Sequence, residues 1–513
     1  MPKRSAFVTL AAIDLEAGST LPLYRQLYAQ LRQAVLSRRL LAGTRLPPTR
    51  ALAEELAVSR NTVVNAFEQL IAEGYLDGKI GSGTYVAHSL GDETLGLRGR
   101  VPAIRRAPST RPEAVARRPG ASRPAPHLSP RGAAIAAGAR EPWAGQSEPC
   151  AFEPGVPALA SFPTKLWSLL AARQWRGATS GLLGYGDPAG YAPLREALAA
   201  YLGASRGVLC VPEQVIIVAG SQQATDLAVR LLLDRGDEVW VEDPGYLDAR
   251  SVVAGAGALP VAVPVDEDGL DLEKGKRSAP RARMVYVSPS HQFPLGVRLS
   301  LARRLALLEW ANRSQAWIVE DDYDSEYRYV GRPLAALQGL DQAGRVIYVG
   351  TFSEVLFPSL RLGYMVVPRE LVESFVTARA LADRHSPLVE QAIVAEFIRA
   401  GHFARHIRRM RELYAERRAV LVEAIERELA DWLTVSAEPA GLHFVAWLCA
   451  GLSDKLVSQR LATKGVSAPP LSRYALAPLA RAGLVLGYGG VDIPQIHAGV
   501  RVMKNVLESL TRR

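Results

Sequence analysis

Several β-prone runs beyond residue 200 end in polar residues whose types suit an anionic ligand. The segment Gly220-Ser221-Gln222-Gln223 follows one run and precedes a helical stretch, so N–H groups at the start of that helix could hold a phosphate. Ser353 and Arg361 bracket a later loop, and a guanidinium matches the geometry of a phosphate group. These residues indicate a site for a phosphorylated ligand.

Two further runs supply a carboxylate and aromatic rings. Asp321 ends the apolar run AWIVEDDYD and is a candidate buried carboxylate, which needs a cationic or hydrogen-bonded partner; Tyr323 follows two residues later. Tyr246, after Asp243-Pro244-Gly245, offers an aromatic face. Taken singly, each candidate also has a structural interpretation, as a capped helix, a core tyrosine or a solvated arginine. Their joint placement favours a ligand site.

The elements that must position these side chains alternate along the chain. From about residue 180, the pattern of strand, turn and helix repeats, which predicts an α/β fold with a mainly parallel sheet. Ligands in open sheets of this kind bind beyond the carboxyl ends of the strands. We therefore expect the polar ends of the strands to converge on one site.

The length of 513 residues exceeds what one hydrophobic core usually supports, so we expect at least two domains. Residues 88–140 hold ten arginines, seven prolines and only three acidic residues, a composition typical of a linker. The predicted division is an N-terminal segment (1–19), a small DNA-binding domain (20–87), this linker (88–140) and a large domain (141–513).

The small domain has the outline of a winged helix-turn-helix. An apolar stripe over residues 22–39, two short helical stretches joined by AVS, and β-prone runs around a Gly-rich turn predict three helices and a wing. The start of the last helix would enter the major groove, while flanking groups hold phosphates. The predicted DNA-binding residues are Arg45, Arg50, Ser59, Arg60, Asn61, Thr62 and Gly83, with Gly81 also in the wing.

The charge and composition of the chain indicate which class of partner it binds. The net charge is +10: residues 1–140 hold 20 Lys and Arg against 10 Asp and Glu, whereas residues 141–513 hold 41 of each kind. An excess confined to the first quarter favours nucleic acid as a partner, and the arginine-rich linker would add non-specific affinity for DNA. Since no 18-residue apolar run occurs, no membrane segment is expected.

The cysteines, Cys150, Cys210 and Cys449, are too far apart for a disulfide framework or a four-ligand zinc site. We therefore expect reduced thiols in a cytoplasmic protein and predict no metal site.

Two sets of motifs resemble known families. LPPTRALAEELAVSRNTVVNAFEQLIAEGYL and GSGTYV resemble the winged helix-turn-helix of the GntR regulators. GSQQATDL, EDPGY, SPSHQFPLGV, VEDDYDSEYRY and GTFSEVLFPSLRLGYMV together resemble the aminotransferase-like domain of the MocR regulators, which fuse a GntR winged helix to a fold-type-I, pyridoxal-phosphate-binding domain. The resemblance implies a bacterial transcription regulator that binds operator DNA as a homodimer and senses a cofactor or amino-compound effector.

The resemblance also implies roles for the candidate residues. Asp321 would pair with the pyridinium nitrogen of the cofactor, Tyr323 with its ring hydroxyl, and Tyr246 would stack on the ring. The phosphate would be surrounded by Ser221, Gln222, Ser353 and Arg361.

One position departs from the resemblance. After Thr-Phe-Ser the family carries the lysine that forms a Schiff base with the cofactor, whereas this chain has Glu354. A carboxylate cannot form an imine, so no internal aldimine forms there and no catalytic residue is predicted.

Three hypotheses follow from Glu354. In the first, the domain binds pyridoxal phosphate, or a preformed adduct with an amino compound, without a covalent bond. In the second, it prefers pyridoxamine phosphate, whose ammonium pairs with Glu354. In the third, it has lost cofactor binding and senses another ligand or none. An aminotransferase carrying a DNA-binding domain is the alternative function. Transamination needs a group that is both imine partner and base, so a regulator is favoured over an enzyme.

Overall fold

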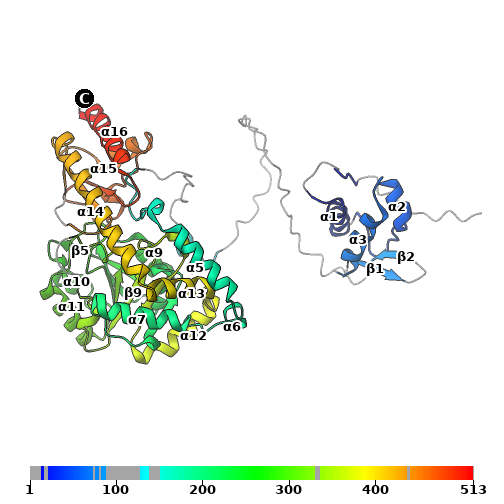
Figure 1. Ribbon diagram of the computed structural model, residues 1–513, viewed down its shortest axis with the longest axis horizontal. Coiled ribbons are helices and arrows are strands. Elements are labelled where there is room, and N and C mark those ends of the chain that lie inside the picture. Colours follow the sequence, from blue (N-terminus) through cyan, green and yellow to red (C-terminus); the bar gives the residue numbers. More distant parts are fainter. Residues whose placement is uncertain are drawn as a thin grey trace, which may run out of the picture. The chain divides into compact units, whose positions relative to one another are not determined.

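The computed structural model describes residues 13–16, 21–37, 39–72, 75–79, 83–87, 128–137, 151–329, 335–435 and 439–511. The chain divides into two compact units, residues 1–121 and 122–513 (Figure 1). No helix within the described ranges has the length and apolar character that crossing a membrane requires.

The first unit is the predicted winged helix-turn-helix. Its elements are three helices and a two-stranded antiparallel hairpin: α1 (Leu23–Leu36), α2 (Thr49–Glu55), α3 (Arg60–Ala72), β1 (Leu76–Lys79) and β2 (Gly83–Val86). Leu27 and Leu31 lie four residues apart on α1 and are fully or almost fully buried against Val63 and Phe67 of α3. The apolar periodicity of the sequence thus forms the core of this unit.

The second unit is built on an eight-stranded sheet, which confirms the predicted α/β fold. Its spatial order is β3 (Val215–Val218), β10 (Gly363–Val366), β9 (Val346–Thr351), β8 (Trp317–Asp322), β7 (Met284–Val287), β4 (Glu238–Asp243), β5 (Leu259–Asp266) and β6 (Gly269–Leu270). The five strands from β9 to β5 are parallel, whereas β10 runs antiparallel to both β3 and β9, and β6 antiparallel to β5.

Helices cover both faces of this sheet (Figure 1). Alternation along the strands separates two cores: Ile217 of β3 packs into one apolar cluster, while Ile216 and Val218 pack into another. The helices of this region are α5 (Thr164–Arg176), α6 (Ser180–Leu183), α7 (Ala192–Arg206), α8 (Ser221–Leu232), α9 (Leu247–Ala256), α10 (Leu272–Ser278), α11 (Leu301–Ser314), α12 (Val372–Asp383), α13 (Leu388–Arg399) and α14 (His402–Glu428).

The C-terminal part of the second unit adds a three-stranded antiparallel sheet. Its strands are β11 (Leu433–Val435), β12 (His443–Leu448) and β13 (Gly483–Gly487), covered by α14, α15 (Asp454–Ala462) and α16 (Ile493–Thr511). The first residue of β12, His443, is buried and belongs to the site described below.

The predicted linker, residues 88–140, contains a helix that the sequence analysis did not anticipate. Helix α4 (Pro130–Ala137) contacts α9 of the second unit, and Ile135 Cγ1 lies 3.2 Å from where a Cβ on Gly255 would be. The average composition of the segment concealed the short apolar run AAIAA. Residues 88–127 and 138–140 of the predicted linker lie outside the described ranges.

Candidate cofactor site and DNA interface

The buried carboxyl group of Asp321 lies at the end of β8, where it has one hydrogen-bond partner. Its Oδ2 accepts a hydrogen bond from the hydroxyl of Tyr286 on the neighbouring strand β7, while its Oδ1 has no partner among the described residues. Burial raises the pKa of Asp321 to about 7, although the Tyr286 hydrogen bond counteracts part of that shift. An unpaired buried oxygen is costly, so this carboxyl suits a ligand that brings an N–H group.

Glu354 follows β9 and brings a second buried carboxyl oxygen to this region. Its side chain is partly exposed, but its Oε2 has neither solvent access nor a hydrogen-bond partner within the described ranges. Burial, reinforced by the negative charge of Asp321, raises the pKa of Glu354 to about 8. Carboxyl groups this close together compete for the same protons and favour a cationic ligand.

Tyr246 and Tyr323 lie in the same electrostatic environment. Burial raises the pKa of both phenols well above the ordinary value, and the charges of Asp321 and Glu354 contribute to both shifts. The four residues thus surround one site. The Tyr246 hydroxyl donates to Asp248 Oδ2 at 3.0 Å, and the Tyr323 hydroxyl lies 3.1 Å from His291 Nδ1.

The residues predicted to hold a phosphate lie around the start of α8. Ser221 is its first residue, after Gly220 with φ 143°, and Arg361 Nη2 lies 3.6 Å from where a Cβ on Gly220 would be. A side chain at Gly220 would be strained. The helix start and Arg361 thus lie at one corner of the candidate site, where their N–H groups could hold an anion.

The other two predicted phosphate residues are less closely tied to this corner. The Ser353 hydroxyl lies 3.1 Å from Thr351 Oγ1 and accepts its hydrogen bond. Gln222 is exposed, and its side chain makes no hydrogen bond within the described part of the chain. The structure thus places the start of α8 near Arg361 but gives the Gln222 side chain no hydrogen bond to the other candidates among the described residues.

Sequence reasoning missed several residues that complete the site. Tyr286 lies inside an apolar run and was not singled out, yet it is the partner of Asp321. Glu242 on β4 is also buried; its Oε2 accepts hydrogen bonds from Ser288 N and Gln292 Nε2, each at 3.3 Å, and burial raises its pKa to about 8. The signal that could have found them is their place at or just before the polar end of a β-prone run.

The other two acidic residues of β8, Glu320 and Asp322, are bound by groups outside the candidate site. Glu320 accepts hydrogen bonds from Leu337 N at 2.7 Å and Gln338 N at 2.8 Å. Asp322 is paired with Arg206 at 2.8 Å. Asp322 Oδ1, like Asp321 Oδ1, has no partner among the described residues, but only the side chain of Asp321 points to the opposite face of the strand, beside Tyr286.

Raising the pH from 5.5 to 8.5 should destabilise the unliganded second unit. The folded pKa values of Asp321, Glu354 and Glu242 are about 7, 8 and 8, whereas ordinary carboxyls titrate near 4. The folded state therefore binds more protons than the unfolded state across this range, and stability is lost as the pH rises through the folded values. Glu354→Gln should reduce this loss by about 1–3 kcal/mol.

Denaturant unfolding at the two pH values, followed by tryptophan fluorescence, measures this effect, because all eight tryptophans lie after residue 121. Glu309→Gln, on the exposed face of α11, is the matched control. A Glu354→Gln variant with the full pH dependence of the natural protein would contradict the assignment.

The candidate DNA interface is centred on the start of α3. Ser59 caps the helix: its hydroxyl accepts a hydrogen bond from Thr62 N at 3.2 Å and lies 2.9 Å from Thr62 Oγ1. Arg60 and Asn61, between them, are exposed. The cap thus fixes the first turn, while these two side chains point into solvent, as base or phosphate contacts require.

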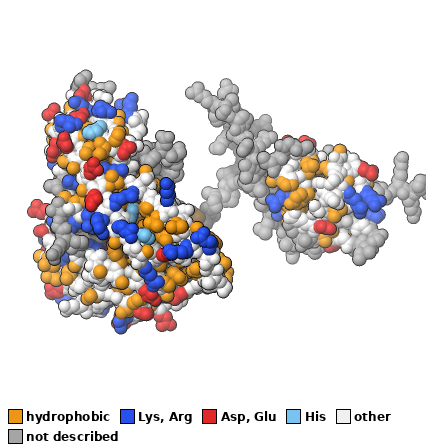
Figure 2. Space-filling model, in the orientation of Figure 1, with side chains coloured by type: hydrophobic (Ala, Val, Ile, Leu, Met, Phe, Trp, Pro, Cys, Tyr) orange, Lys and Arg blue, Asp and Glu red, His pale blue; other side chains and the backbone are white. Residues whose placement is uncertain are grey.

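The wing brings two more predicted residues together. Arg45 pairs with Tyr85 of β2 in an antiparallel bridge, and its guanidinium lies 5.9 Å from the centre of the Tyr85 ring. Gly83 has φ 110°, and a Cβ there would come 3.1 Å from Arg45 Nε. Arg50 is exposed on α2, whereas Gly81 lies outside the described residues. Figure 2 shows a group of Lys and Arg side chains on this unit.

Comparisons with known proteins divide the chain in the same way. Residues 23–86 match the family of bacterial regulatory proteins, gntR family, and residues 162–482 match aminotransferase class I and II.

Relatives match over almost the whole length. The chain is 43% identical over 497 residues to the probable rhizopine catabolism regulatory protein MocR of Rhizobium meliloti, covering 97% of this chain and 96% of that protein. It is 32% identical to the pyridoxine biosynthesis transcriptional regulator PdxR of Corynebacterium glutamicum, with 91% and 92% covered. Among solved structures, α-aminoadipate aminotransferase LysN of Thermus thermophilus, complexed with N-(5'-phosphopyridoxyl)-L-leucine, matches 71% of this chain and 93% of its own at 31% identity and a TM-score of 0.65.

Proposed function

This chain belongs to the MocR-type transcription regulators of the GntR family, and we propose that its aminotransferase-like unit senses pyridoxamine phosphate or a related phosphopyridoxyl amine without a covalent bond. The observation that carries the proposal is the buried Oε2 of Glu354, which has no hydrogen-bond partner among the described residues and stands where the family motif has lysine. The chain keeps the residues that would hold the rest of such a ligand.

The residues present fit the phosphate group and the pyridine ring of a vitamin B6 phosphate. The first turn of α8 and Arg361 would hold the phosphate, because backbone N–H groups and a guanidinium converge there. Asp321 Oδ1, which has no partner among the described residues, would accept a hydrogen bond from the protonated pyridine nitrogen. These residues would bind and orient the ring whether its substituent is an aldehyde or an amine.

The side chain of Glu354 would determine whether the site prefers the aldehyde or the amine form of the ligand. An ammonium group beside this carboxylate would supply the missing hydrogen-bond donor and offset the crowding of negative charge that contributes to its raised pKa of about 8. An aldehyde offers neither a donor nor a positive charge. The LysN relative supports this class of ligand, since its structure is a complex with a phosphopyridoxyl amine.

Titration calorimetry of the full-length protein with pyridoxamine phosphate and with pyridoxal phosphate tests the proposal. We expect pyridoxamine phosphate to bind roughly tenfold more tightly or better, which corresponds to a modest charge-assisted hydrogen bond. Glu354→Gln should abolish the preference, because it removes the charge but keeps the shape of the side chain.

Glu309→Gln controls for the loss of an acid elsewhere on the same unit. Equal affinity for the two ligands in the natural protein would contradict the proposed selectivity. Failure of both ligands to bind would instead favour a sensor of a different ligand.

The winged helix would pass this signal to DNA. Membership of the GntR family implies DNA binding, and the proposed readers are Arg60 and Asn61 at the exposed start of α3, with Arg45, Arg50 and Gly83 toward the backbone. We further propose a homodimer, whose two winged helices would bind two half-sites of an operator. Ligand binding to the large unit would then alter operator affinity.

A further inference from the structure

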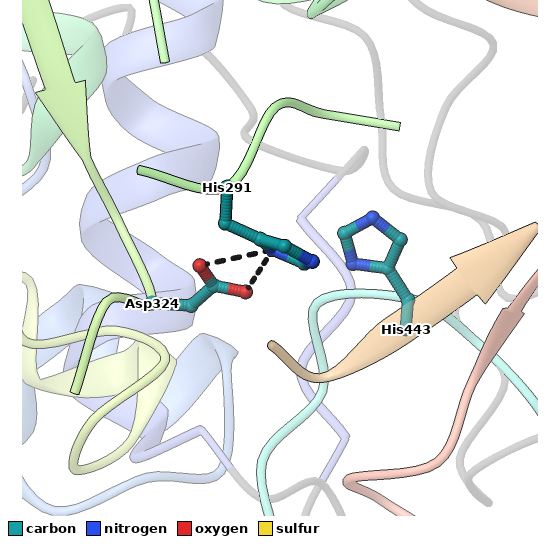
Figure 3. Close-up of side chains that lie close together, drawn as sticks. All are labelled: His291, Asp324 and His443. Atoms are coloured by element: carbon teal, nitrogen blue, oxygen red, sulfur yellow. Dashed lines mark hydrogen bonds and ion pairs between the residues drawn. The ribbon is translucent and has the colours of Figure 1, made fainter. Parts of the chain in front are cut away.

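Three buried side chains outside the described roles come together beside Tyr323. His291 follows β7, Asp324 follows β8, and His443 begins β12; their exposed fractions are 4%, 1% and 2%. One ligand atom from each lies within 4.8 Å of the others. In Figure 3 the ring of His291 lies between the carboxylate of Asp324 and the ring of His443.

Two members of this His291–Asp324–His443 cluster are hydrogen-bonded to each other, whereas the third, His443, is hydrogen-bonded to the backbone of Pro294. His291 Nδ1 lies 2.9 Å and 3.2 Å from the two oxygens of Asp324. The ring of His443 lies 5.1 Å from that of His291, centre to centre, and its Nε2 is buried with no partner among the described residues. Burial holds the pKa of His443 well below its ordinary value, so its imidazole is neutral.

The backbone is shaped to admit the cluster. Gly441 has φ 77°, and a Cβ there would come 2.0 Å from His291 Cε1 and 2.7 Å from Asp324 Oδ2. A small cavity borders His291 and Asp324 and is also lined by Ser290 and Gly441. Such a cavity offers room for a water molecule beside the cluster.

We propose that His291, Asp324 and His443 bind a divalent transition-metal ion, with Zn²⁺ the ion that the donor set suits best. Two imidazole nitrogens and one carboxylate oxygen are typical zinc ligands, at about 2.0–2.2 Å from the metal, and water from the adjacent cavity would complete a tetrahedron. Ligand atoms around such an ion lie about 3.4 Å apart, so the cluster must contract by roughly an ångström. Side-chain rotation would supply that contraction.

The charges around the cluster are mixed. Arg206 and Arg328 both line the cavity, and the guanidinium of Arg206 is paired with Asp322 at 2.8 Å. Asp321 and Glu354 add further carboxyls to this part of the unit. Because the Tyr323 hydroxyl lies 3.1 Å from His291 Nδ1, the metal site would adjoin the proposed cofactor site and could influence it.

The test uses full-length protein treated with a chelator and then given Zn²⁺ alone, with the affinity measured by competition against a chromophoric chelator. We expect one bound ion per chain. His443→Gln and the isosteric Asp324→Asn should each weaken binding by roughly 100-fold or more, since each removes a direct ligand.

The matched control is His402→Gln, which alters another histidine whose ring nitrogen has no partner within the described ranges but which lies outside the cluster, at the start of α14. Its affinity for Zn²⁺ should equal that of the natural protein. If His443→Gln does not fold, as judged by circular dichroism, the affinity of Asp324→Asn for Zn²⁺ tests the site in its place. Absence of binding in the natural protein, or equal binding by the folded cluster variants, would overturn the site in favour of a hydrogen-bonded pair beside a neutral histidine.

Discussion

Replacing Glu354 with lysine is expected to change the protein from one that does not attach pyridoxal phosphate covalently to one that does. The side chain at this position follows Thr-Phe-Ser and lies close enough to Asp321 for their charges to interact. A primary amine there could form an imine with the cofactor aldehyde, whereas a carboxylate cannot. After borohydride reduction, intact mass spectrometry of Glu354→Lys should show near-complete addition of one cofactor per chain.

The natural protein and Glu354→Gln serve as controls and should show no addition. No lysine occurs between Lys276 and Lys455, so the strands β8, β9 and β10 carry none that could substitute. Specific labelling of the natural protein would show that a lysine elsewhere reaches the cofactor. An unlabelled but folded Glu354→Lys variant would show that the site does not present this position to the cofactor.

Arg60→Ala is expected to weaken operator binding by roughly 10- to 100-fold at fixed salt concentration, the range for losing one specific arginine contact. Arg60 is exposed at the start of α3, directly after the Ser59 cap, so its loss should leave the helix intact. Electrophoretic mobility shift or fluorescence anisotropy with an operator fragment measures the change.

Arg25→Ala is the matched control, because it removes one exposed positive charge from α1 of the same unit. Arg25→Ala should weaken operator binding only slightly, and this effect should disappear as the salt concentration is raised, as expected for a non-specific charge. Unchanged operator affinity in Arg60→Ala would mean that α3 does not enter the groove through its first turn.

Features that depend on neighbouring residues could be predicted from the sequence. The spacing of Leu27 and Leu31 fixes a buried stripe on α1, and the polar residues after each apolar run locate the ligand edge of the large sheet. Such patterns are local, because helix and strand periods act over a few residues. Helix α4 escaped prediction for the opposite reason, since one short apolar run is hidden in an arginine- and proline-rich average.

Partners that are distant in the sequence could not be predicted. Tyr286 and Asp321 are 35 residues apart, and only the pairing of β7 with β8 joins them. The Nε2 of His443 lacks a partner within the described ranges, and its ring lies 5.1 Å, centre to centre, from that of His291, 152 positions earlier (443 minus 291). Periodicity carries no information about which strand of a second sheet reaches the first one.

The three consecutive acids of β8 show how a strand can set the charge that a ligand meets. Glu320 and Asp322 face one side, where backbone N–H groups and Arg206 hold them, and Asp321 faces the other beside Tyr286. A single-residue deletion in β8 would preserve most of its composition but turn its side chains to the opposite faces. The phase of the strand, rather than its number of acids, thus determines which carboxyl group of β8 lies beside Tyr286 and which is held by arginine.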